Sequence, residues 1–194
     1  MQPITIHDTR NASPESAALL AGVETQLGFI PNVFAALAGS TPALKAFLDL
    51  NARFSETSLS GIEREVVQLV ASAENGCGYC VAGHTVFACD QRMDEDVLRA
   101  LRSSTPLPDP KLEALARFTR GLVRRRGHDC GSELEDFVAA GYSPANALEV
   151  LVGISVKTMS NLASNAFAIP LDDAFGGCAW SPGEGSREIG SRVA

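Results

Sequence analysis

Two cysteines and one histidine, close together in the sequence, are the side chains best suited to chemistry. The stretch ENGCGYCVAGHTVFA, residues 74–88, places Cys77 and Cys80 in a C-x-x-C arrangement, with His84 four residues after the second cysteine. Thiols and an imidazole at this spacing are compatible with a metal clip, a structural disulfide or a reactive thiol pair. The rest of the sequence has to decide between these three interpretations.

A helix through these residues would bring the three side chains onto one face. At 100° per residue, Cys80 lies at about −60° and His84 at about −20° from Cys77 around the helix axis. Cys80 and His84 are also i,i+4 neighbours, so their side chains can meet directly. A thiol in the first turn of a helix and beside an imidazole has a lowered pKa. The spacing therefore favours a reactive thiol pair, with Cys80 nearer to the histidine.

A carboxylate one helix upstream extends this candidate site. The segment SGIEREVVQLVASA predicts a helix over residues 60–73, which begins with a capping box formed by Ser60 and Glu63. Glu65 lies at the edge of the apolar face of that helix, where an unpaired carboxylate is costly. Because a short link joins the two helices, they should pack together and bring Glu65 close to His84 or the thiols. A carboxylate, an imidazole and two thiols would form a proton relay.

The overall composition is that of an ordinary globular chain. The 194 residues carry a formal net charge of −7, and 45% of them are hydrophobic. Nothing in this balance draws the protein to nucleic acid or to a membrane, and neither a secretory signal nor a membrane-spanning run is visible. We therefore expect a cytoplasmic protein, in which thiols stay reduced unless they are catalytic. Five cysteines with a single close pair do not resemble a disulfide framework.

Cap and breaker residues predict an all-α fold of roughly eight helices. Ser-Pro, Thr-Pro and Asp-Pro pairs mark helix starts, and no segment alternates strongly enough to require a strand. The helical segments that these signals predict are residues 13–21, 32–38, 41–54, 60–73, 77–88, 94–102, 109–125, 132–140 and 143–164.

The C-terminal segment is expected to be an irregular tail. From about residue 169 the chain is rich in Gly, Ser and Pro, and it should be ordered in part if Phe175 and Trp180 pack. The length fits one domain or a compact pair of subdomains. We interpret residues 1–194 as a single domain, with the helices that carry the motif at about 60–89.

A longer stretch of the sequence resembles a known family. REVVQLVASAENGCGYCVAGHTVFA is similar to the signature of the carboxymuconolactone decarboxylase superfamily, in its alkylhydroperoxidase D-like, peroxidase-related branch. That branch carries a glutamate twelve residues before a C-x-x-C-x-x-x-H motif, and Glu65, Cys77, Cys80 and His84 match it position by position. LGFIPNVFAALAGSTPALKAFLDL and LEVLVGISVKTMSNLASNAFAIPLDDAF resemble the family's N-terminal region and C-terminal helix. The resemblance therefore covers about residues 27–175.

The resemblance implies an all-helical enzyme that reduces hydroperoxides without a metal or other cofactor. Cys80 would be the peroxidatic thiol, which passes through a sulfenic acid, and Cys77 would be the resolving thiol that closes the disulfide. Glu65 and His84 would relay protons through a water. A thioredoxin-like or lipoyl-type dithiol would reduce the disulfide, and the chain would form a homo-oligomer, either a dimer, a trimer or a hexamer.

Two places depart from the family pattern. Gly78 and Tyr79 lie between the cysteines, where some relatives have a histidine. Near the C-terminus, relatives often carry an Asn-His pair after the asparagine that matches Asn161, whereas this chain has Asn165 and no histidine. The resemblance therefore carries over no site residue from this last helix.

Other functions stay open at this point. A decarboxylase, the founding activity of the superfamily, would need no thiol pair. The C-x-x-C pair could also be half of a zinc site with His84, or two cysteines packed as small hydrophobes, in a redox-sensing or zinc-binding helical module. No second C-x-x-C or H-x-x-x-H pattern is present to complete a zinc site. The other cysteines are expected to be incidental, and they are Cys89, Cys130 and Cys178.

Overall fold

The computed structural model describes residues 4–183, and this part of the chain is built from helices and their connections. It holds nine α-helices and one 3-10 helix, so the expected all-α fold is confirmed, with one helix more than the rough estimate and a short 3-10 helix in the tail. The elements are α1 (Pro14–Leu27), α2 (Asn32–Leu37), α3 (Thr41–Ser55), α4 (Gly61–Glu74), α5 (Gly78–Asp90), α6 (Glu95–Ser103), α7 (Pro110–Arg125), α8 (Gly131–Ala139), α9 (Pro144–Phe167) and η1 (Asp173–Cys178).

The helix starts follow the caps in the sequence. Ser60 and Glu63 form the expected reciprocal capping box at α4, and Ser143 caps α9 with Asn146 in the same way. The sequence predicted that α1 ends near Ala21, and this prediction was wrong. The helix continues through Gly22 and ends at Leu27, because Gly28 supplies the left-handed residue that closes it, with φ of 80°.

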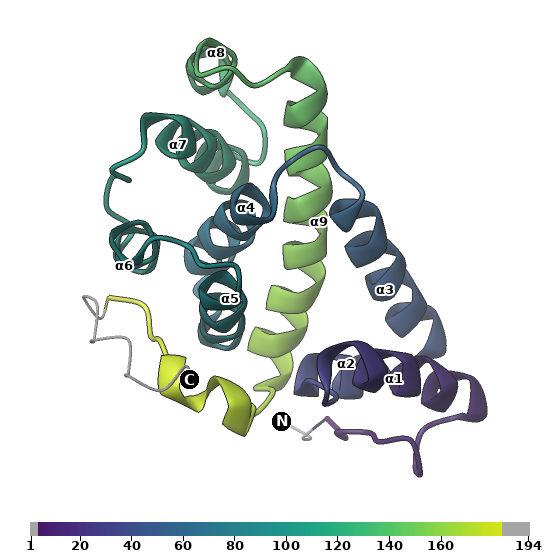
Figure 1. Cartoon of the computed structure of the whole chain (residues 1–194). Coiled ribbons are helices and arrows are strands. Elements are labelled where there is room, and N and C mark those ends of the chain that lie inside the picture. Colours follow the sequence, from purple (N-terminus) through teal and green to yellow (C-terminus); the bar gives the residue numbers. More distant parts are fainter. Residues whose placement is uncertain (1–3, 184–194) are drawn as a thin grey trace.

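The long helix α9 is the element around which the others are arranged. Figure 1 shows α9 between two groups of helices, with α1 to α3 on one side and α4 to α7 on the other. Helices α2, α3, α4, α5 and α7 all contact it. Gly153 allows the close approach, because a Cβ at this position would lie 2.5 Å from Phe54 Cζ of α3 and 2.8 Å from Val67 Cγ1 of α4.

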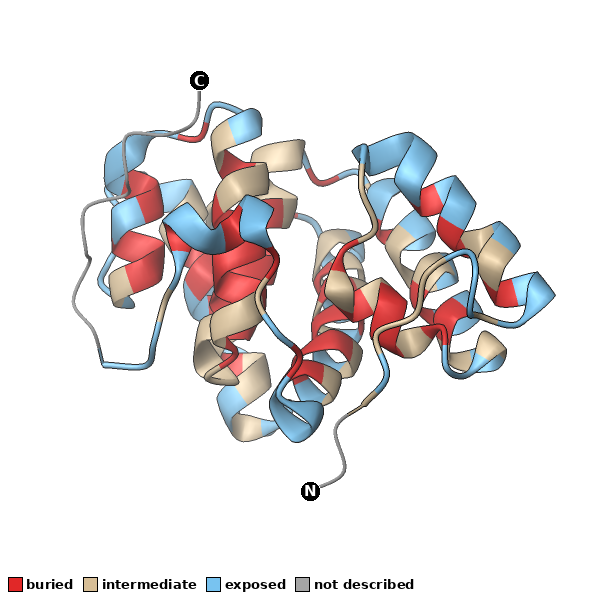
Figure 2. Ribbon diagram, turned by 90° about the horizontal axis from the view of Figure 1, so that it is seen from below, coloured by how far each residue is buried: buried red, intermediate tan, exposed pale blue. Residues whose placement is uncertain are grey.

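Helix α4 forms the centre of the core on the other side of α9. Six consecutive residues of α4, from Glu65 to Val70, are buried, and the helix contacts α5, α6, α7 and α9. Figure 2 shows the buried residues on the helix faces that turn inward, with exposed residues on the outer faces. A helix enclosed on so many sides fixes the position of its few polar side chains, and Glu65 is one of them.

The tail after α9 is ordered by packing, as the sequence suggested for Phe175 and Trp180. Phe175 of η1 is buried, and the Trp180 indole donates a hydrogen bond to the carbonyl oxygen of Arg102. Arg102 in turn donates to the carbonyl oxygens of Cys178 and Ala179. The part of the expected tail beyond residue 183 lies outside the described residues.

A membrane span was not expected from the sequence. No single helix between residues 4 and 183 has the length and apolar character for one, and only α8 and α9 together, bent by 118°, meet that test by length and composition.

Candidate active site

The two cysteines lie at the start of α5, where the chain turns from α4. Cys77 is the N-cap residue, so the helix itself begins at Gly78, one position after the expected start. The Cys77 sulfur accepts a hydrogen bond from the Cys80 N–H at 3.4 Å. Gly76, with φ of 61°, makes the tight link between the helices possible. Both thiols are free, and both are buried, with Cys80 3% exposed. Cys80 is therefore held at the helix start, where unpaired N–H groups and the helix dipole favour a thiolate.

The structure brings Glu65 and His84 together, as the helix projection predicted. Glu65 Oε2 of α4 lies 2.8 Å from His84 Nδ1 of α5, and both side chains are largely buried. A carboxylate accepts hydrogen bonds only, so Nδ1 carries the proton in this contact. The other ring nitrogen, Nε2, is then free to face the remaining site.

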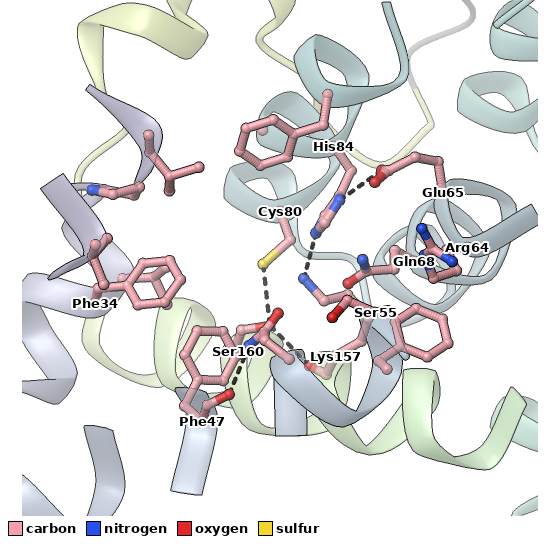
Figure 3. A pocket seen from close by; sticks show the side chains of 18 of the residues that line it. Phe34, Phe47, Ser55, Arg64, Glu65, Gln68, Cys80, His84, Lys157 and Ser160 are labelled. Atoms are coloured by element: carbon pink, nitrogen blue, oxygen red, sulfur yellow. Dashed lines mark hydrogen bonds and ion pairs between the residues drawn. The ribbon is translucent and has the colours of Figure 1, made fainter. Parts of the chain in front are cut away.

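Helix α9 supplies two further site residues that the sequence analysis missed. Lys157 Nζ lies 2.6 Å from His84 Nε2, and Ser160 Oγ lies 3.7 Å from Cys80 Sγ. Figure 3 shows Cys80, His84, Lys157 and Ser160 turned toward one another, with Glu65 behind the imidazole. The direct neighbour of His84 Nε2 is therefore the Lys157 side chain.

The surroundings of the two thiols separate their acidities. The pKa of Cys80 is held well below its ordinary value, first by a hydrogen bond from the Cys77 thiol and then by the charge of Lys157 and by the neighbouring His84 and Ser160, against the effect of burial. The pKa of Cys77 is raised by the same hydrogen bond and by its burial. These opposite shifts favour a thiolate at Cys80 and a thiol at Cys77.

A pocket opens on this group of side chains. Its volume is about 750 Å³, and Cys80, His84 and Lys157 lie in its wall together with Glu65 and Ser160. Aromatic side chains from four different elements form much of the remaining wall, and they are Phe34, Phe47, Phe54, Tyr79, Phe87 and Phe175. The pocket can therefore hold an organic molecule with a large apolar part next to the thiolate.

Gln68 adds a polar group to this wall. Its side chain lies one helical turn after Glu65, is 8% exposed, and its Oε1 has no hydrogen-bond partner among residues 4–183. An acceptor in such a place is available to a bound molecule.

Tyr79, between the two cysteines, has a positioning role. Its hydroxyl donates a hydrogen bond of 2.5 Å to Asp172 Oδ2 and accepts one from the Val33 N–H. Burial raises the pKa of both Tyr79 and Asp172. This contact ties the motif to α2 and to the segment before η1.

The remaining cysteines do not line the pocket. Burial raises the pKa of Cys89 and of Cys178, and Cys130 lies by Arg125 at the start of α8. Within residues 4–183 no group of three or more His, Cys, Asp or Glu side chains is arranged to hold a metal ion.

One signal in the sequence could have identified Lys157. It is one of two charged residues in α9, and its spacing of four residues from Gly153 and three from Ser160 places it on the buried face of that helix. A lone charge on a buried face is costly unless it has a partner, which is the argument that identified Glu65. Lys157 could therefore have been identified as a candidate site residue from the sequence of residues 144–167.

A comparison with protein families matches the part of the chain that carries the motif. Residues 41–120 match the carboxymuconolactone decarboxylase family. The matched residues include α4 and α5 but not α9. A search of curated proteins finds no match.

Solved structures match over most of the chain. A peroxidase-related protein from Ralstonia eutropha JMP134, described as an alkylhydroperoxidase AhpD core, has a TM-score of 0.79 and 20% identity over 90% of this chain and 96% of its own. A peroxidase-related protein from Silicibacter sp. TM1040 has a TM-score of 0.76 and 21% identity, with 89% and 91% covered. The debrominase Bmp8 has a TM-score of 0.71 and 17% identity, with 84% and 89% covered.

These findings define first a class of protein, an all-helical domain with the alkylhydroperoxidase D-like fold, which holds a C-x-x-C pair beside a Glu–His pair. The match over residues 41–120 is to the carboxymuconolactone decarboxylase family, the family that the motif resembles, and the solved structures show the same fold over most of the chain.

Proposed function

We propose that the protein is a hydroperoxide reductase that uses Cys77 and Cys80 as a redox dithiol. The observation that carries this proposal is the division of the pair into a thiolate and a thiol. A hydrogen bond from Cys77 and the charge of Lys157 favour the Cys80 thiolate, and Cys80 lines a pocket of about 750 Å³. A buried thiolate with a second thiol next to it is suited to two-electron reduction of a peroxide bond.

The chemistry proceeds in three steps. The Cys80 thiolate attacks the terminal oxygen of the hydroperoxide, which gives a sulfenic acid on Cys80 and releases the alcohol after protonation of its alkoxide. Cys77 then attacks the Cys80 sulfur, and the disulfide forms with loss of water. An external dithiol, thioredoxin-like or lipoyl-type, reduces this disulfide by exchange. Glu65 and His84 take part in the movement of protons, and a reducing compartment such as the cytoplasm would supply the dithiol.

The aromatic pocket wall favours an organic hydroperoxide over hydrogen peroxide as substrate. Six aromatic side chains line the pocket, and they would bury the apolar part of a bound molecule. Hydrogen peroxide has no apolar part and would gain nothing from this wall. We expect kcat/KM to be higher for an aromatic or long-chain hydroperoxide than for hydrogen peroxide.

The test is reduction of an organic hydroperoxide in the presence of a dithiol, followed by loss of peroxide. Cys80→Ser should abolish turnover, and Cys77→Ser should stop the cycle at a sulfenic acid that a sulfenic-acid trapping reagent labels on Cys80. Cys130→Ser is the matched control, because Cys130 does not line the pocket, and it should keep the wild-type rate. Turnover that survives Cys80→Ser would contradict the proposal.

A second candidate is the reductive dehalogenation of an aromatic halide, favoured by the aromatic wall around the thiolate. The Cys80 thiolate would take the halogen, the carbanion would be protonated, and Cys77 would displace halide to give the same disulfide. One aryl halide and two thiols would thus give one arene, one disulfide, one halide ion and a proton. Release of bromide from a brominated pyrrole in the same assay, without peroxide turnover, would favour this candidate.

A further inference from the structure

Two side-chain contacts join α5 to α9 across the site. Cys80 faces Ser160, and His84, one turn later on α5, faces Lys157, one turn earlier on α9. The residues are spaced by four on α5 and by three on α9, so each pair lies on one face of its helix. Figure 3 shows the Lys157 amine in contact with His84, with the Cys80 sulfur on the neighbouring turn of α5 in contact with Ser160.

No carboxylate among residues 4–183 forms an ion pair with the Lys157 ammonium. The side chain is 3% exposed. Glu65 is separated from it by the imidazole ring, because it binds Nδ1 whereas Lys157 binds Nε2. A buried ammonium is stabilised by an opposite charge nearby, and a Cys80 thiolate would supply one, since the charge of Lys157 lowers the pKa of Cys80.

The two contacts of His84 fit a neutral imidazole. With the Nδ1 proton directed at Glu65, Nε2 presents a lone pair and accepts a hydrogen bond from the lysine ammonium. Glu65 and His84 thus hold the ammonium in place, while Lys157 and Cys80 both line the pocket and the charge of Lys157 lowers the pKa of Cys80.

We propose that Lys157 is a catalytic residue, the acid that protonates the alkoxide leaving from the hydroperoxide, and that His84 and Glu65 position it. This inference rests on the proposed peroxide reduction. It assigns the proton transfer to a residue of α9, whereas the motif on α4 and α5 supplies the thiols and the positioning pair.

The protons and electrons balance over the cycle. Thiolate attack on the terminal oxygen forms the S–O bond and breaks the O–O bond, and the alkoxide takes a proton from the Lys157 ammonium, which leaves a sulfenic acid, an alcohol and a neutral amine. The amine then takes the Cys77 proton, the Cys77 thiolate attacks Cys80, and the departing hydroxide takes that proton and leaves as water. Reduction by the external dithiol returns two thiols, and the Cys80 proton passes to the amine, which restores the thiolate and the ammonium.

The test compares two oxidants that differ in the need for an acid. tert-Butyl hydroperoxide leaves as a basic alkoxide that needs a proton, whereas peracetic acid leaves as a carboxylate that does not. Single-turnover rates of Cys80 oxidation are measured on the reduced protein and divided by the thiolate fraction, which is obtained from thiolate absorbance. Lys157→Met should lower the rate with tert-butyl hydroperoxide about 100-fold or more, and the rate with peracetic acid less than about tenfold.

Two further variants separate proton donation from charge. Lys157→Arg keeps the positive charge, but a guanidinium does not give up a proton near neutral pH. This variant should therefore show the same loss of rate with tert-butyl hydroperoxide and not with peracetic acid. Lys45→Met, at an exposed lysine of α3, should change neither rate. Equal losses with both oxidants in Lys157→Met would overturn the assignment of Lys157 as the acid.

Failure of the inference and failure of the proposed function give different results. If the wild-type protein oxidises Cys80 with neither oxidant, peroxide reduction itself is wrong. If the Lys157 variants do not fold, a series of hydroperoxides on the wild-type protein decides instead. A rate nearly independent of the acidity of the leaving alcohol supports an acid in the site, and a rate that rises steeply with that acidity overturns it.

Discussion

At the scale of single residues, the chemistry depends on the difference between the pKa values of the two thiols. Cys77 and Cys80 are three residues apart and both buried, yet their pKa values move in opposite directions, because Cys77 donates a hydrogen bond that Cys80 accepts. Lys157 and Ser160 support the thiolate from the other side. The reactivity of Cys80 is therefore a property of this set of neighbours rather than of the C-x-x-C spacing alone.

These opposite shifts predict how stability depends on pH. An unfolded thiol has a pKa of about 8.5. The contribution of Cys80, whose folded pKa is lower, is present above that value and is lost as the pH falls through the folded pKa. The contribution of Cys77, whose folded pKa is higher, is present below about pH 8.5 and is lost as the pH rises. The difference in free energy of unfolding between wild type and Cys80→Ala should therefore be largest near pH 8.5.

The measurement is denaturant unfolding under reducing conditions across the pH range from 5 to 10, for both proteins. If the difference in free energy of unfolding between the two proteins does not change with pH, the opposite pKa shifts of Cys77 and Cys80 are wrong.

The residues that the sequence could identify differ in kind from those that it missed. Glu65, Cys77, Cys80 and His84 lie within twenty residues on two successive helices, so helix periodicity and a short link were enough to bring them together. Lys157 is 73 residues from His84, and only the packing of α9 against α5 decides that they meet. Contacts of that kind depend on tertiary structure, which periodicity does not determine.

At the scale of elements, α9 is the helix whose position matters most. Gly153, one turn before Lys157, lies against Phe54 of α3 and Val67 of α4, so it fixes the distance between α9 and both groups of helices. The caps predicted where most helices begin, but they gave no information on which helix would be central. Gly22 and Gly153 are both helical glycines, and only the structure shows that the second is required by close packing.

Gly153→Ala should therefore destabilise the protein and lower its activity. The added Cβ would meet two side chains at less than 3.0 Å, and relief of that overlap costs about 1–3 kcal/mol in the free energy of unfolding. Displacement of α9 would also move Lys157 away from His84. Denaturant unfolding and peroxide turnover measure the two effects.

Gly22→Ala in α1 is the matched control, since nothing lies within 4 Å of its added Cβ. It should stabilise the protein by about 0.5–1 kcal/mol and leave turnover unchanged. Equal effects of the two substitutions on stability would show that Gly153 has no packing role.

At the scale of the whole molecule, one face of α9 is not covered by any other part of residues 4–183. Its exposed residues follow a spacing of three and four along the helix and carry no charge, and they include Leu148, Leu151, Ser155, Thr158 and Leu162. The side chains of Leu148 and Leu162 are 66% and 63% exposed. We propose that a second copy of the chain covers this face, because an uncharged stripe can meet itself across a two-fold axis without repulsion between like charges.

Leu148→Glu combined with Leu162→Glu should weaken this self-association, since four carboxylates would then meet at the interface. Light scattering after size exclusion should show a homo-oligomer for wild type and a shift toward the monomer for the double variant. Glu24→Gln, an exposed change on α1, should leave the wild-type mass unchanged. An unchanged mass in the double variant would place the interface elsewhere, and a monomeric wild type would contradict the oligomer itself.

The most direct test of the central claim is the mass of the protein after one equivalent of an organic hydroperoxide. The reduced chain should lose two hydrogens, and peptide mapping should locate the new disulfide between Cys77 and Cys80, with Cys89, Cys130 and Cys178 still free. Cys77→Ser should instead gain one oxygen on Cys80. An unchanged mass for the wild-type protein, or oxidation on the other cysteines alone, would contradict a redox dithiol at this site.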